Sequence, residues 1–169
     1  DQAHQHIRML PPLQPLAVPL VKALGLVCAE DVLAVTNCPT VDSSLKDGFA
    51  VVSSDIADAS PAHPVQLSVI GTSTAGDGND TVQVRPGTAI RIMTGAPIPR
   101  GATAVLASEF AQVNGKIVTI WADARAGRNI LGKGSDIGQN QVVLKSGSCN
   151  GPAHLGLLAA AGVNEVLLY

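Results

Sequence analysis

The chain has 169 residues, of which 46% are hydrophobic, 14% are charged and 2% are aromatic, and its formal net charge is −2. This length and hydrophobic content suit one ordinary domain or two small ones, and they exclude a chain that is disordered throughout. Nucleic acid is not expected as a partner, because the sequence has no basic stripe and few rings on which bases could stack. Three cysteines without a CxxC pair argue against zinc, and no apolar run reaches the length of a membrane span, so we expect no membrane insertion and a cytoplasmic protein.

In chain order, the sequence first predicts an N-terminal helical segment over 1–14, stopped by two prolines, and then a short helix and a strand within 15–34. Short β-branched runs separated by Gly, Pro, Asn or Asp follow, which is typical of strands. The dipeptide Asn114-Gly115 predicts a tight hairpin between two of them. These expected strands are 48–52, 65–71, 88–93, 104–110 and 116–122.

The C-terminal part begins with a glycine-rich loop over 126–139, followed by a strand at 142–147, a helix at 151–162 and a last strand at 163–169. The pattern predicts a mixed α+β fold that is mainly β. A small α/β domain I, made of 15–34 and 136–169, is interrupted by domain II, a β-rich insertion over 35–135.

One candidate site is a possible phosphate loop at 127–133, "GRNILGK". It matches the start of GxxxxGK, but Gly134 stands where Ser or Thr would bind magnesium, and no helix follows. We therefore reject a nucleotide P-loop. A glycine-rich loop that offers Lys133 and Asp136 remains as the weaker interpretation.

A second candidate is "VDSSLKDGFAVV", in which Asp47-Gly48 is a turn signal. Ser44 and Lys46 add a hydroxyl and a cation beside the carboxylate, so Asp47 should stay ionised and can hold a hydrated magnesium ion. On local chemistry alone a turn aspartate and a functional aspartate both remain open. "RIMTGAPIP" leaves a similar choice, because Thr94-Gly95 provides either a rigid turn or exposed hydrogen-bond donors.

Four motifs, taken in their order along the chain, say more about the family of this protein than any single motif does. The motifs are "SSLKDGFAV", "RPGTAIRIMTGAPIPRGATAV" with Glu109 after it, "AGRNILGKGSDIG" and "GPAHLGLLAAAGVNEVLLY". Together they resemble the N-terminal region, domains I and II, of the molybdenum insertase family, which includes bacterial MoeA, the plant Cnx E domain and the animal gephyrin E domain. Lys46 before Asp47 and "GLLAAAGV" lean toward the eukaryotic branch.

The resemblance implies a small α/β domain I interrupted by domain II, within a longer homodimeric protein. It implies insertion of molybdate into adenylylated molybdopterin with Mg²⁺, in molybdenum cofactor biosynthesis. By matched position, it implies Asp47, Thr94 and Asp136 as catalytic residues, with Asp47 and Asp136 also binding the metal. Five further residues are implied as cofactor-binding residues: Ser44, Lys46, Gly95, Glu109 and Lys133.

Three departures from the family pattern bear on activity. Leu131 and Gly132 stand where the family often has a basic residue, and Phe110 replaces an acidic one. Tyr169 falls where the molybdopterin-binding domain should begin, so we expect these 169 residues to be inactive alone. The alternative is a gephyrin-like scaffold or dimerisation module without catalysis, with receptor or cytoskeletal partners.

Overall fold

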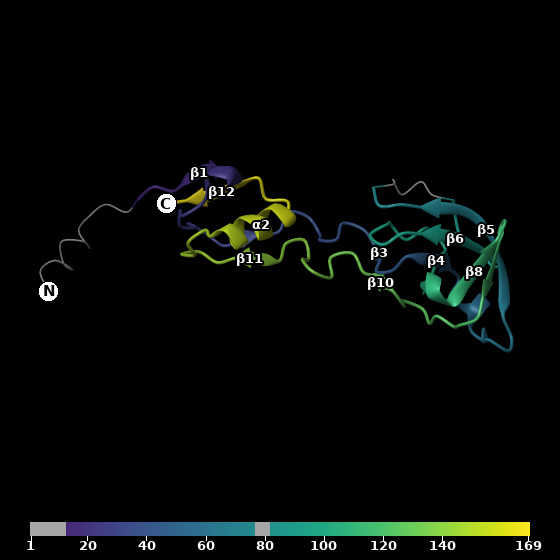
Figure 1. The fold of residues 1–169 in the computed structure, drawn as a ribbon. Helices are drawn as coiled ribbons and strands as arrows, with labels where there is room; N and C mark the ends of the chain where they lie inside the picture. Colours follow the sequence, from purple (N-terminus) through teal and green to yellow (C-terminus); the bar gives the residue numbers. More distant parts are fainter. Residues whose placement is uncertain (1–12, 77–81) are drawn as a thin grey trace, which may run out of the picture. The chain divides into compact units, whose positions relative to one another are not determined.

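The computed structural model describes residues 13–76 and 82–169, so most of the helical segment expected at 1–14 lies outside the described residues. The described chain divides into two compact units, which are considered separately (Figure 1). Unit 1 contains the described residues up to Cys38 together with Asp136–Tyr169, and unit 2 is Pro39–Ser135. The chain therefore leaves unit 1 once and returns to it once, and unit 2 is continuous in sequence.

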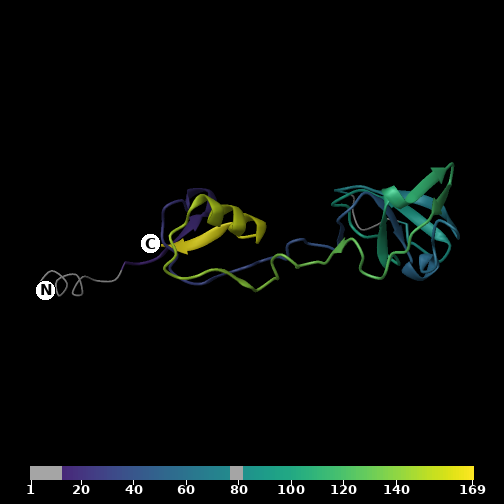
Figure 2. The same cartoon turned by 60° about the horizontal axis from the view of Figure 1, so that its bottom comes forward.

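Unit 2 is built on a six-stranded, strongly curled sheet (Figure 2) with the strand order β7-β4-β6-β5-β9-β8. Neighbouring strands are antiparallel, except for the parallel pair β5 and β6. The six strands are β4 (Gly48–Val51), β5 (Val65–Ser73), β6 (Thr88–Ile92), β7 (Ala104–Ala107), β8 (Ala111–Asn114) and β9 (Ile117–Ile120).

Strand β4 is buried along its whole length, which explains why "GFAV" is apolar without alternation. Phe49 and Val51 pack into one hydrophobic cluster, whereas Ala50 between them packs into another. Because successive side chains of a strand point to opposite faces, β4 has core on both sides. The strand is therefore rigidly packed, and so the residues that directly precede and follow β4 in the sequence are held at fixed positions.

The predicted hairpin is confirmed, because β8 and β9 are antiparallel with Asn114 opposite Ile117. The strand expected at 104–110 is shorter than predicted, since Ser108–Phe110 forms a 3-10 turn, η3. A second such turn, η2, lies at Ser53–Ile56. Two very short strands were missed: β3 (Ser43–Ser44) pairs with β10 (Ile130–Leu131).

Unit 1 combines one helix with two two-stranded sheets. The helix α2 (Pro152–Ala160) begins with proline and buries Leu158 in the core of the unit. The sheets are β1 (Leu16–Pro19) with β12 (Glu165–Leu168), and β2 (Val32–Leu33) with β11 (Val142–Leu144).

The short helix expected within 15–34 is wrong. Residues Leu16–Pro19 form β1 instead, followed by a 3-10 turn, η1, at Leu20–Lys22. Pro15 and Pro19 bracket this segment and disfavour a continuous helix, and pairing with β12 satisfies the backbone of the segment as a strand. The fold class, mixed α+β and mainly β, is confirmed. Within the described ranges, no helix combines the length and apolar character that a membrane crossing would need.

Candidate functional site

Asp47 and Thr94, which are 47 residues apart, meet at one end of the unit 2 sheet. Asp47 comes directly before β4 and Thr94 lies just beyond the end of β6, and Gly48 faces Ile92 in the antiparallel register. The Asp47 Oδ1 atom accepts two hydrogen bonds from Thr94, one from its backbone N–H at 2.7 Å and one from its hydroxyl at 2.8 Å. The strand pairing therefore joins the two motifs into one structural feature.

These contacts keep Asp47 ionised. The backbone hydrogen bond from Thr94, then its hydroxyl, and more weakly the charge of Arg91 hold the pKa of the Asp47 carboxyl below its ordinary value of 3.8. Partial desolvation opposes them. Both Asp47 and Thr94 are exposed, so the second carboxylate oxygen can meet water or a ligand. Among the described residues, Oδ2 of Asp47 takes part in no hydrogen bond.

A cavity of about 320 Å³ adjoins Asp47 in unit 2. Its polar lining includes Arg91 on β6 and Ser108, whose N–H donates to the Asp47 carbonyl oxygen at 3.0 Å. The cation beside Asp47 is thus Arg91, which was not predicted from the sequence as a site residue. The sequence does contain one signal for Arg91: it is a charged residue within the apolar run "AIRIM", three positions before Thr94.

Several donors that the sequence assigned to a ligand are already used within the protein. Both donors of Thr94 bind Asp47, and the Gly95 N–H donates to the Ser44 carbonyl oxygen at 2.8 Å. The buried Ser44 hydroxyl donates to the Lys46 carbonyl oxygen at 2.6 Å. In this structure Thr94, Gly95 and Ser44 therefore hold the turn in place, and their expected roles in catalysis and cofactor binding stay predictions.

Lys46 and Glu109 line a different cavity of unit 2, of about 410 Å³. Phe110, Asp123 and Arg128 share this lining. The neighbouring residues Lys46 and Asp47 thus line separate cavities. Lys46 is not the partner of Asp47 that the adjacency in sequence indicated.

Lys133 belongs to a third cavity of unit 2, of about 280 Å³, together with Arg100 and Asp42. Asp42 Oδ1 accepts a hydrogen bond from the Lys133 N–H at 2.7 Å, and this bond fixes the glycine-rich loop beside β3. Neither Asp42 nor Arg100 was predicted from the sequence as a site residue. Asp42 stands at the start of "VDSSLKDG", where nothing local separates it from a loop residue.

Asp136 belongs to unit 1, whereas Asp47 belongs to unit 2, so a magnesium site shared by the two carboxylates stays a prediction. Asp136 is exposed, and its N–H donates to the Cys38 carbonyl oxygen at 3.1 Å. Within 13–76 and 82–169, no cluster of three or more His, Cys, Asp or Glu side chains has the arrangement of a metal site. The described part of unit 2 therefore shows no closed metal cage.

Unit 2 is a curled, β-rich insertion with an anchored aspartate at one end of its sheet, and unit 1 is a small α/β unit. Known proteins that resemble this chain identify the class that combines these two features. Residues 1–162 match the family model of the MoeA N-terminal region (domain I and II), and the chain belongs to this family. It is 40% identical over 167 residues to molybdopterin molybdenumtransferase 2 of Mycobacterium tuberculosis, covering 98% of this chain and 41% of the relative. It is 35% identical over 155 residues to the molybdopterin molybdenumtransferase of Synechococcus elongatus, covering 92% and 38%.

The fold has a counterpart among solved structures. The molybdopterin biosynthesis MoeA protein of Pyrococcus horikoshii superposes with a TM-score of 0.91 at 32% identity, over 99% of this chain and 43% of that one. The chain thus spans about two fifths of the length of these relatives. Because the relatives are bacterial and archaeal, they give no support to the eukaryotic leaning of Lys46 and "GLLAAAGV".

Proposed function

We propose that this chain is the N-terminal part of a molybdopterin molybdenumtransferase. It supplies part of a composite site at which molybdate is inserted into adenylylated molybdopterin during molybdenum cofactor biosynthesis. The family and the names of the relatives support this proposal. The structural observation that carries it is the contact between Asp47 and Thr94, because it turns two separate motifs into one exposed, ionised and oriented carboxylate.

Asp47 suits the role of a carboxylate that orients water or anchors a cation. Thr94 binds Oδ1 of Asp47 and so fixes the orientation of the carboxylate. The other oxygen, Oδ2, is therefore held in a defined direction. Magnesium in phosphate sites is often bound by one or two carboxylates, with water and phosphate oxygens completing the shell. Asp47 is compatible with such a single anchor, and Asp136 is our candidate for a second. The ion would neutralise charge on the phosphate of the adenylate.

The cationic side chains are proposed to offset the charge of the anionic substrates. Arg91 lies beside Asp47, Lys46 and Arg128 line the second cavity, and Lys133 with Arg100 lines the third. These cations partly compensate for the absence of a basic residue at Leu131 and Gly132. Glu109 in the second cavity is proposed to accept hydrogen bonds from the substrate.

The rest of the site is proposed to come from a molybdopterin-binding domain, because the chain spans only about two fifths of its relatives. The complete protein would act as a cytoplasmic homodimer. The 169 residues alone are expected to show no hydrolysis of adenylylated molybdopterin.

A chimera tests this proposal. These 169 residues replace the matching region of the Mycobacterium relative, and the chimera is expressed in a host that lacks its own molybdopterin molybdenumtransferase. We expect restored activity of a molybdoenzyme, and loss of that activity with Asp47→Asn. Asp58→Asn, an exposed aspartate elsewhere in unit 2, is the matched control and should retain activity.

Two results decide against the proposal. Full activity of the Asp47→Asn chimera would remove Asp47 from the site. A chimera that is folded and soluble but restores nothing would favour the non-catalytic scaffold.

A further inference from the structure

The second cavity of unit 2, of about 410 Å³, combines an aromatic ring with charges of both signs. The ring is that of Phe110. The cations are Lys46 and Arg128, and the carboxylates are Glu109 and Asp123. The volume lies within the range of about 300–1,000 Å³ that is typical of small-molecule sites. The lining is therefore suited to a ligand that is itself partly flat and partly charged.

The Phe110 side chain is 43% exposed, although phenylalanine is among the residues that folding most often buries. The other phenylalanine of the chain, Phe49, is buried in the core of unit 2. The backbone of Phe110 is held in place, because it ends the turn η3 and its carbonyl oxygen accepts the Trp121 N–H at 3.1 Å. An exposed ring on a fixed backbone is a surface on which a planar group can stack.

The four charged groups of this cavity do not neutralise one another. The ion pair that the described residues form, Lys145 with Asp31, lies in unit 1. Within 13–76 and 82–169, the two cations and Asp123 have no side-chain hydrogen bond, and Glu109 accepts only a long one, from its neighbour Ser108 at 3.4 Å. Charges that line one cavity without pairing are available to a ligand, and hydrogen bonds to charged groups are the strong ones.

Hydrogen bonds hold the walls of the cavity together. The Val105 N–H of β7 donates to the Arg128 carbonyl oxygen at 3.0 Å, and the Leu45 N–H donates to the Asn129 carbonyl oxygen at 2.9 Å. These two bonds join the glycine-rich loop to β7 and to the segment before β4. Leu106, which also lines the cavity, is buried in the core. The cavity is consequently formed before a ligand arrives, which lowers the entropic cost of binding.

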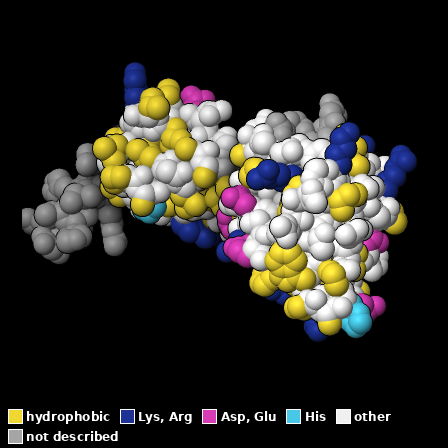
Figure 3. All heavy atoms as spheres, turned by 45° about the vertical axis from the view of Figure 1, so that its right-hand side comes forward, with side chains coloured by type: hydrophobic (Ala, Val, Ile, Leu, Met, Phe, Trp, Pro, Cys, Tyr) yellow, Lys and Arg dark blue, Asp and Glu magenta, His cyan; other side chains and the backbone are white. Residues whose placement is uncertain are grey.

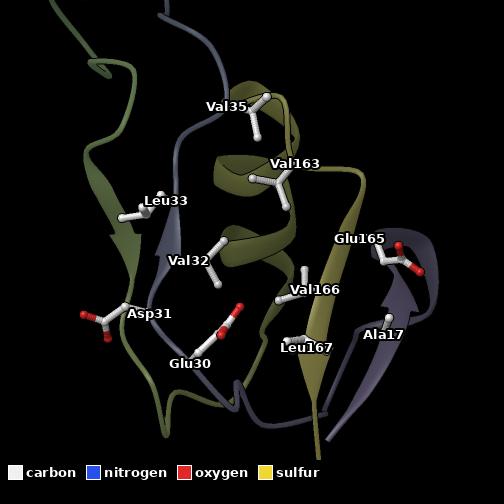
Figure 4. A pocket seen from close by; sticks show the side chains of 10 residues that line it. All are labelled: Ala17, Glu30, Asp31, Val32, Leu33, Val35, Val163, Glu165, Val166 and Leu167. Atoms are coloured by element: carbon white, nitrogen blue, oxygen red, sulfur yellow. The ribbon is translucent and has the colours of Figure 1, made fainter.

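Other cavities lack this combination. The described lining of the cavity of about 360 Å³ in unit 1 (Figure 4) is apolar and acidic, without a cation or a ring. In the cavity beside Asp47, the ring of Phe49 is only 4% exposed. The surfaces differ in the same way: the visible face of unit 2 carries basic and acidic side chains among hydrophobic ones, whereas that of unit 1 is mainly hydrophobic (Figure 3).

We propose that the second cavity binds a nucleoside monophosphate, the adenylate half of the adenylylated substrate, with the adenine ring stacked on Phe110. This rests on the proposed function, in which a molybdopterin-binding domain holds the molybdopterin half. Lys46 and Arg128 pair with the phosphate. Glu109 accepts hydrogen bonds from the ribose hydroxyls, as acidic residues do in dinucleotide sites. A single exposed ring suits one base rather than a strand of nucleic acid.

The probe is adenosine 5′-monophosphate (AMP), added to the 169-residue chain. We expect shifts of the Phe110 and Asn129 amide signals in NMR spectra, and a change in the fluorescence of Trp121, whose N–H is bonded to Phe110. Ribose 5-phosphate lacks the base and should bind about five-fold more weakly or worse, because one base stacked on a ring contributes at least that much. Adenosine lacks the phosphate and should also bind more weakly.

Two variants of exposed residues separate the ring from the charges. Phe110→Leu stays apolar but loses the ring, so it should weaken AMP about five-fold or more and leave ribose 5-phosphate unchanged. Arg128→Gln should weaken both phosphates and leave adenosine unchanged. The matched controls are Tyr169→Leu, which removes a similarly exposed ring from unit 1, and Arg85→Gln, which removes an exposed cation elsewhere in unit 2. Neither control should change an affinity.

Four outcomes would overturn this inference. Equal affinity of Phe110→Leu and the unaltered chain for AMP would exclude stacking. Shifts confined to the surroundings of Asp47 would place the nucleotide in another cavity. Tighter binding of a free pterin than of AMP, with shifts at Phe110, would assign the cavity to the molybdopterin half. Absence of AMP binding, combined with an active chimera, would refute this inference and leave the proposed function standing.

Discussion

Replacing Gly48 with alanine is expected to destabilise unit 2 severely. Gly48 follows Asp47 and opens β4, which pairs with β6 on one side and β7 on the other. A Cβ atom at this position would lie 1.9 Å from the Leu106 carbonyl oxygen, 2.9 Å from the Leu106 carbonyl carbon and 3.0 Å from the Ala107 Cα. The obstacle is the backbone of β7, not a side chain that can rotate away.

The magnitude follows from these distances. Ordinary contact begins at 3.4 Å, so the Cβ and the Leu106 oxygen must separate by roughly a further 1.5 Å. Such a movement breaks the pairing of β4 with β7. Overpacking of a core costs about 1–3 kcal/mol, and more when the backbone must move, so we expect a loss of about 3 kcal/mol or more. For a unit of this size, that loss lowers Tm by about 12 °C or more.

The assay can follow unit 2 by itself. The single Trp121 lies in unit 2 and the single Tyr169 in unit 1, so tryptophan fluorescence during urea unfolding reports unit 2. The matched control is Gly71→Ala in β5 of the same sheet, where a Cβ meets nothing within 4 Å. We expect that variant to be neutral or slightly stabilised. Equal stability of the two variants would refute the steric argument.

Two further predictions concern the turn at Thr94 and the left-handed residue Asn129. Thr94→Val removes the hydroxyl bond but keeps the stronger N–H bond, so the pKa of Asp47 should rise part of the way toward 3.8, whereas Thr94→Ser should leave it low. Because the pKa of Asp47 is lowered by folding, its contribution to stability is complete above about pH 3.8 and is lost as the pH falls through the folded value. Carbon NMR titration and unfolding between pH 2 and pH 6 measure both effects, and identical pKa values in the Val and Ser variants would contradict the hydroxyl bond. Asn129 has a φ of 57° and its Nδ2 donates to the Val105 carbonyl oxygen at 2.9 Å, so Asn129→Ala should cost about 2 kcal/mol in urea unfolding followed by Trp121. Asn129→Gly should recover about half of this loss, and equal losses would show that the backbone angle is not strained.

Much of the fold was predictable because the signals are local. The Asn114-Gly115 turn fixes a hairpin within a few residues, and Pro152 and Gly162 mark the two ends of the helix region. The errors arose where pairing partners are distant in sequence. Leu16–Pro19 becomes a strand through β12 at the other end of the chain, and no local pattern indicates this.

The candidate site was predictable as residues but not as an arrangement. Asp47 and Thr94 each look like turn residues locally, and only the antiparallel register of β4 and β6 brings them together. The same register places Arg91 near Asp47, whereas Lys46 lines another cavity. Adjacency in sequence was therefore a poor guide to which charges interact.

The way the chain crosses between the two units has a consequence for the order of folding. Cys38 and Ile137 are hydrogen-bonded to each other in unit 1, so closing this contact in an unfolded chain means closing a loop of about a hundred residues. Once unit 2 has folded, the bond between Asp42 and Lys133 holds the two ends of that loop together, and only three residues on each side separate this bond from the Cys38–Ile137 pair. The entropic cost of assembling unit 1 then falls by roughly 2 kcal/mol, so the insertion acts as an internal template that speeds the formation of the unit that carries it.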